Sequence, residues 1–210
     1  MKHTVLCLLL ALAATAASCS DDDAPLAAYR QDLVDLLTDA DGQPAYLVPA
    51  SGDTLRVASA VQSAQTLAAD TTLRFLALYL QSGTEADVRA LQQVVCKKPV
   101  AAPEEERKCD PIEVAALWRS GRYVNFLLSF KTSGAAHSLA FLFNGVRSNS
   151  AGGKTLCLSL QHDANDDVAN YTAQAYASCI VGDFNLSAPT DSIEVRYFGS
   201  DGAQAKRIAF

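Results

Sequence analysis

Short extended segments separated by turn signals fill most of the chain, and this pattern restricts it to an all-β fold. Asp41-Gly42 and Asp201-Gly202 each stand between two such segments, and Asp-Gly is a preferred two-residue loop of β-hairpins. Runs of four to eight apolar, aromatic or β-branched residues bounded by turns are typical of strands. A brief helix remains an alternative at residues 59–70 and 86–96. We therefore expect many short strands joined by tight turns.

The expected strands fall into two groups, divided by a stretch rich in prolines and charges. Residues 28–98 hold about five strands, a number compatible with a small barrel of the oligonucleotide-and-oligosaccharide-binding (OB) type. Residues 99–110 have little to bury and are expected to form a linker. Residues 111–210 hold about seven strands at the spacing of an immunoglobulin-like β-sandwich.

The N-terminus has the layout of an export signal. Lys2 precedes an apolar run, Val5 to Ala14, which is too short to span a bilayer as a stable helix. Small residues then lead into Cys19, and this ending resembles the lipobox of bacterial lipoproteins. We expect residues 1–18 to be a signal peptide, Cys19 to carry lipid, and residues 19–27 to form an acidic tether.

The net charge limits the class of partner. The chain has 17 Lys and Arg against 23 Asp and Glu, and removal of the signal peptide takes away Lys2, so the mature charge is 16 minus 23, or −7. A chain this acidic repels nucleic acid phosphates and anionic lipid surfaces. We expect no nucleic acid partner, and we expect membrane contact only through the lipid on Cys19.

Cysteine usage is consistent with an exported protein. Six cysteines become four once Cys7 leaves with the signal peptide and Cys19 is acylated. An even number in an exported chain favours disulfides, although four free or buried thiols remain an equal alternative. Local pairing joins the first two across the linker and the last two across an expected hairpin that turns near Asp167. The four residues are Cys96, Cys109, Cys157 and Cys179.

Several motifs together resemble a known family. Asp110-Pro111-Ile112 leads to the run from Trp118 to Asn125, Trp-Arg-Ser-Gly-Arg-Tyr-Val-Asn, and Leu160-Gln161-His162-Asp163 follows. With the lipobox and the all-β N-terminal unit, this pattern resembles the NigD-like lipoproteins of Bacteroidota. The resemblance implies an OB-like domain before a β-sandwich, no established enzyme activity, and a proposed role in bacteriocin self-immunity. Asp21 to Asp23 is similar to the signal that sends lipoproteins of this phylum to the outer face of the outer membrane.

Trp118 and Asn125 are the candidate ligand contacts. They flank an expected tight hairpin, where an indole ring stacks on a sugar and an amide binds hydroxyls. The simpler interpretation is that Trp118 packs across the sandwich, as a single Trp beside a hairpin usually does. A glycan-binding face also needs several exposed aromatics, and this chain has one Trp.

Metal and catalytic motifs are weak. Asp163, Asn165 and Asp167 alternate as in the first half of a calcium loop, but the later glycine and glutamate of such a loop are absent. His137 and His162 are the imidazoles of the mature chain, and no Gly-x-Ser-x-Gly motif accompanies them. We expect no metal, no cofactor and no catalytic residue.

The leading hypothesis from sequence is a non-enzymatic lipoprotein of the outer membrane that faces the cell exterior and binds a protein partner. The alternative is a glycan- or peptide-capture module at the cell surface. Exposed aromatic residues in a groove favour the alternative, and a flat polar surface favours protein binding.

Overall fold

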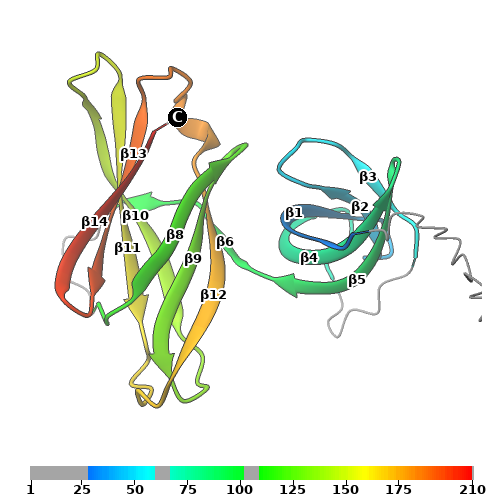
Figure 1. Ribbon diagram of the computed structural model, residues 1–210, viewed down its shortest axis with the longest axis horizontal. Helices are drawn as coiled ribbons and strands as arrows, with labels where there is room; N and C mark the ends of the chain where they lie inside the picture. The colour runs from blue at the N-terminus through cyan, green and yellow to red at the C-terminus, as the bar shows by residue number, and fades with distance from the viewer. Residues whose placement is uncertain (1–27, 60–66, 102–108, 210) are drawn as a thin grey trace, which may run out of the picture.

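The computed structural model describes residues 28–59, 67–101 and 109–209, and nearly all regular structure within them is β-strand. Figure 1 shows a small barrel beside a larger sandwich, which confirms the expected all-β fold. The strands, with one short 3-10 helix, are β1 (Arg30–Thr38), β2 (Pro44–Val48), β3 (Leu55–Val57), β4 (Thr72–Ser82), β5 (Glu85–Gln93), β6 (Val95–Lys97), β7 (Val100–Ala101), β8 (Glu113–Ser120), β9 (Tyr123–Thr132), β10 (Ser138–Ser148), β11 (Lys154–Asp163), β12 (Tyr171–Ile180), η1 (Gly182–Phe184), β13 (Ser192–Gly199) and β14 (Gly202–Ala209).

The first unit is a closed barrel with strand order β1-β2-β3-β5-β4, in which β1 also pairs with β4. Its interior is filled by alternate residues, and Val34 and Leu36 of β1 are both fully buried. The expected turn at Asp41-Gly42 joins β1 to β2. Gly42 has φ of +74°, a conformation that glycine adopts without steric cost.

The second unit consists of two facing sheets, with strand orders β14-β13-β11-β10-β7 and β6-β12-β9-β8. Apolar residues from both sheets form one core. Phe126 of β9 stacks on Phe141 of β10 with 5.1 Å between ring centroids. Burial of one such side chain stabilises a fold by roughly 1.5–3 kcal/mol, so the inward faces of the sheets account for the cohesion of the sandwich.

Two short strands, β6 and β7, lie near the expected boundary between the units. Val95–Lys97 pairs in parallel with β12, and Val100–Ala101 pairs in parallel with β10. We expected the first segment in the barrel domain and the second in the linker, but both belong to sheets of the sandwich. Residues 102–108 of the expected linker lie outside the described residues.

Candidate functional site

A buried ion pair on the outer surface of the barrel lies where the sandwich packs against it. Asp35 of β1 and Arg74 of β4 are register partners, and because Val34 and Leu36 point inward, Asp35 points outward. Arg74 Nη1 donates to Asp35 Oδ1 at 2.9 Å. The Arg74 side chain is only 3% exposed and that of Asp35 is 19% exposed. A charge pair on a barrel exterior is this buried only because another unit covers it.

The sandwich supplies the remaining contacts from the hairpin between β8 and β9. The Tyr123 hydroxyl donates to Asp35 Oδ2 at 3.1 Å and accepts from Arg122 Nε at 2.9 Å. The Arg74 guanidinium lies 4.1 Å from the Tyr123 ring centroid, in a cation–π arrangement. Burial, with the nearby Asp35 carboxylate opposed by Arg122, raises the pKa of Tyr123 to about 12. Tyr123 therefore stays neutral, keeps its proton and donates a hydrogen bond to Asp35.

Asn125, one of the two candidate ligand contacts, is part of this junction. Its side chain is fully buried, and its Oδ1 accepts hydrogen bonds from Ser178 Oγ at 2.8 Å and Arg74 Nη2 at 3.4 Å. Its Nδ2 donates to Ser120 Oγ at 2.8 Å. The expectation that Asn125 contacts a ligand is therefore wrong, because its amide already bonds to three partners inside the protein.

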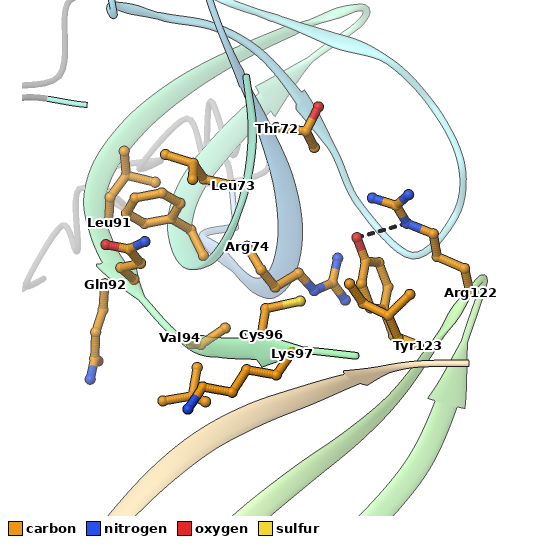
Figure 2. Close-up of a pocket in the computed structure, with 14 residues that line it drawn as sticks. Thr72, Leu73, Arg74, Leu91, Gln92, Val94, Cys96, Lys97, Arg122 and Tyr123 are labelled. Carbon is orange, nitrogen blue, oxygen red and sulfur yellow. Dashed lines mark hydrogen bonds between the residues drawn. The ribbon is translucent and has the colours of Figure 1, made fainter. Parts of the chain in front are cut away.

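A cavity of about 750 Å³ opens beside the ion pair, between the barrel and the sandwich. Figure 2 shows Arg74, Arg122 and Tyr123 on one side of it and Leu73 and Leu91 on another. The described residues that line this cavity include three cationic side chains and no carboxylate. The Lys97 ammonium donates to the Leu139 carbonyl oxygen at 2.9 Å. The lining of the cavity therefore has a cationic part and an apolar part.

A second cavity of about 470 Å³ lies at the same boundary and contains Trp118. Trp118 makes an edge-to-face contact with Tyr176, at 6.4 Å between ring centroids, and Asp32 and Gln31 of the barrel also line the cavity. Trp118 does not belong to the sandwich core of the described residues. It packs at the boundary between the units, partly exposed, on the same face as its register partner Asn125.

The four described cysteines, Cys96, Cys109, Cys157 and Cys179, are free thiols, so neither expected bridge is present. The argument for the second bridge also fails on topology. Cys157 lies on β11, which pairs with β10 and β13, whereas Cys179 lies on β12 in the opposite sheet. The segment through Asp167 crosses between the sheets and forms no hairpin. Burial raises the pKa of the Cys179 thiol to about 12.

The two histidines of the mature chain form one hydrogen-bonded cluster with Asp167. His137 Nδ1 lies 2.8 Å from His162 Nε2, and His137 Nε2 lies 3.1 Å from Asp167 Oδ2. His162 Nδ1 lies 3.3 Å from the carbonyl oxygen of Asp110, so this ring donates there and its Nε2 accepts from His137. Burial lowers the pKa of His162. The network therefore contains a neutral His162.

Asp167 accepts hydrogen bonds from the end of β9 and the loop that follows it. Thr132 Oγ1 donates to it at 2.6 Å, and the hydroxyl and amide of Ser133 donate to it as well. These donors, with Ser133 first, lower the pKa of Asp167 far below its usual range. No cluster of three or more His, Cys, Asp or Glu side chains suited to a metal ion exists within residues 28–59, 67–101 and 109–209. The Ser133 hydroxyl thus donates to the Asp167 carboxylate and not to a histidine.

The expected lipidation site, Cys19, lies outside the described residues, as do the signal peptide and the tether. In the part of the chain that the structure describes, no helix has the length and apolar character needed to cross a membrane.

Comparison with solved structures supports the fold across both units. A NigD-like immunity protein from Bacteroides caccae is 25% identical, with a TM-score of 0.65 over 85% of this chain and 91% of that one. A candidate toxin-related protein from Parabacteroides distasonis is 17% identical, with a TM-score of 0.67 over 87% of this chain and 93% of that one. A candidate lipoprotein from Bacteroides fragilis is 10% identical, with a TM-score of 0.54 over 86% of this chain and 96% of that one.

A comparison with curated proteins finds no match. The family model described as the NigD-like C-terminal β-sandwich domain matches residues 94–208, which begin just before β6 and end within β14. This range is more than half of the chain. The chain therefore belongs to the NigD-like family.

Proposed function

We propose that this protein is a lipid-anchored immunity protein. It binds a protein toxin at the surface of the cell that produces the toxin. The observation that carries the proposal is the similarity to the NigD-like immunity protein from Bacteroides caccae, which extends over 85% of the chain. Acylation of Cys19 would hold the protein at the outer membrane. The aspartates at positions 21–23 would direct it to the outer face, where a toxin arrives.

The junction between the barrel and the sandwich supports a binding role. Asp35 and Arg74 of the barrel bond to Tyr123 and Asn125 of the sandwich, so the two units are held in one arrangement. A rigid surface loses less conformational entropy when a partner binds. The mature charge of −7 favours a partner with a basic contact surface and speeds their encounter.

The histidine cluster also fits binding better than hydrolysis. Ser133 donates to Asp167, and His137 is held between Asp167 and His162, so these groups satisfy one another. Neither of the two cavities described at the boundary is lined by His137 or His162. We therefore propose no reaction for this cluster and assign it to the stability of the sandwich.

Glycan capture is a second candidate function, favoured by the cavity that contains Trp118. Trp118 and Tyr176 make an edge-to-face contact in this cavity. Asp32 and Gln31 provide hydrogen-bonding groups for sugar hydroxyls. One Trp and one Tyr form a small platform. The cavity suits a single ring rather than an extended chain.

One experiment separates the two candidates. Tagged protein is incubated with detergent-solubilised envelopes and with the secreted proteins of the native host, and the captured material is analysed by mass spectrometry for proteins and by glycan analysis for sugars. A toxin-like protein captured equally by wild type and Trp118→Ala supports immunity. Tyr46→Ala is the control, because Tyr46 is also an exposed aromatic residue. If wild type and Tyr46→Ala capture a glycan and Trp118→Ala does not, the immunity proposal is overturned in favour of glycan capture.

A further inference from the structure

The strongest unexplained feature is Arg74, whose guanidinium is only partly used by the protein. Nη1 bonds to Asp35 and Nη2 to Asn125, but the buried Nε has no hydrogen-bond partner among the described residues. A buried donor left without an acceptor destabilises the folded protein. The side chain is 3% exposed and lines the 750 Å³ cavity. An acceptor brought in by a ligand would remove this destabilisation.

The charge around Arg74 is suited to an anionic ligand. Asp35 neutralises one positive charge, and Arg122 provides a second, with its Nη2 lying 3.8 Å from the same carboxylate. Asp35, Arg74 and Arg122 together carry a formal charge of about +1, although the total charge of the protein is negative. Arg122 is 54% exposed, so it reaches the opening of the cavity.

A guanidinium edge fits a carboxylate or a phosphate, and the apolar part of this cavity favours a carboxylate carried on an apolar body. The edge that carries Nε presents parallel N–H groups at the spacing of the two oxygens of a carboxylate. On another side of the cavity, Leu73 and Leu91 form an apolar part of the wall (Figure 2). We propose that the cavity binds a ligand with a carboxylate at one end of a short apolar body, and that Arg74 and Arg122 hold the carboxylate.

Two sources offer this chemistry, a fatty acid and the C-terminal residue of a peptide. The inference does not depend on the proposed immunity function, because it concerns a small ligand inside the cavity. Octanoate represents the fatty acid, and N-acetylleucine represents a peptide C-terminus. Their neutral partners are octanamide and N-acetylleucinamide, which keep the apolar body and lack the charge.

Cys96 offers a direct readout of occupancy. Its thiol lies beside the Arg74 guanidinium in Figure 2, and it lines the cavity. Burial raises the pKa of this thiol, and a ligand that fills the cavity would slow its alkylation further. Cys157 is also half-buried but does not line the cavity, so it serves as an internal control.

The test uses full-length mature protein with Cys19→Ser, titrated by calorimetry, with alkylation at Cys96 and Cys157 mapped in parallel. We expect at least one carboxylate to bind and protect Cys96 alone, with its amide about tenfold weaker or more. Arg122→Gln should weaken binding about tenfold, while Arg89→Gln, an exposed arginine paired with Asp87 on β5, should leave it unchanged. The identity of the carboxylate that binds more tightly distinguishes the two sources.

Three results would overturn the proposal. The first is the absence of both heat and Cys96 protection with either carboxylate at millimolar concentrations. The second is equal binding of acid and amide, which would make the cavity an apolar site. The third is unchanged binding in Arg122→Gln while the variant keeps the wild-type unfolding curve.

Discussion

The hydroxyl of Tyr123 on β9 donates a 3.1 Å hydrogen bond to the carboxylate of Asp35 on β1, and this bond joins residues 88 positions apart across the boundary between barrel and sandwich. Arg74 connects the same two units, since it pairs with Asp35 and lies over the Tyr123 ring. The two β units are therefore linked by charged and polar groups with little exposure, and their relative arrangement depends on a small number of side chains.

Replacement of Asp35 by Asn should strongly destabilise the protein. Arg74 would keep its charge in a nearly dry position without the carboxylate that compensates it, and loss of one partner of a buried ion pair costs about 3–5 kcal/mol. Urea unfolding measures the change. Asp87→Asn is the matched control, because its partner Arg89 is exposed and such a change stays within about 0.5 kcal/mol. Equal stability of the two variants would show that the Asp35–Arg74 pair does not stabilise the fold.

Stability should fall as pH drops through the range of histidine titration. The folded pKa of His162 is lowered from its ordinary value of 6.5, so below about pH 6.5 the unfolded chain binds a proton that the folded protein rejects. The contribution of neutral His162 to the free energy of unfolding is complete above about pH 6.5 and is lost progressively below it. His162→Gln, whose amide oxygen still accepts from His137, should flatten the dependence between about pH 7.5 and 5.5. Chemical denaturation at several pH values measures both slopes. An unchanged slope in the variant would assign the dependence to other groups.

Gly42 should tolerate no side chain. A Cβ there would lie 2.5 Å from the Leu67 carbonyl oxygen, in addition to the strain of φ at +74°. Gly52 also has positive φ, +86°, but faces open space. Both Ala variants should lose about 1–2 kcal/mol from the left-handed backbone, and Gly42→Ala should lose about 1–3 kcal/mol more from the clash. Thermal unfolding compares them, and equal losses would mean that the turn moves freely away from Leu67.

Cys19→Ala should release the protein from membranes, because one acylated cysteine is the proposed attachment. Fractionation of cells that express the wild type or the variant tests this directly. Wild-type protein should sediment with the outer membrane and the variant should remain soluble in the envelope. Continued sedimentation of the variant would require a second anchor.

The local features of this fold were predictable from sequence, because they depend on neighbouring residues. Asp41 and Gly42 lie in the expected turn between β1 and β2. The expected hairpin of β13 and β14 is also present, but its two-residue turn is Ser200-Asp201, one residue before the expected Asp201-Gly202, because Gly199 pairs with Gly202. These patterns contain both the turn chemistry and the alternation of apolar residues, so little long-range information was needed.

The pairing of distant strands and the junction between the units were not predictable in this way. Alternation places Cys157 on a strand but does not say which sheet the next strand joins, so the expected hairpin with β12 was wrong. The amide of Asn125 is of a type that often binds ligands. In this protein it bonds instead to Arg74, 51 residues away, which approaches it only after both units fold. A single arginine and a single aspartate 39 residues apart leave no local signal of a buried pair.

The central claim, that this protein confers immunity, is tested most directly by deleting its gene in the native host and measuring survival in the presence of toxins from the same strain and its siblings. The account predicts that the deletion strain becomes sensitive to at least one of them, and that wild-type protein restores resistance while Cys19→Ala does not. Full resistance of the deletion strain to all of these toxins would contradict the account.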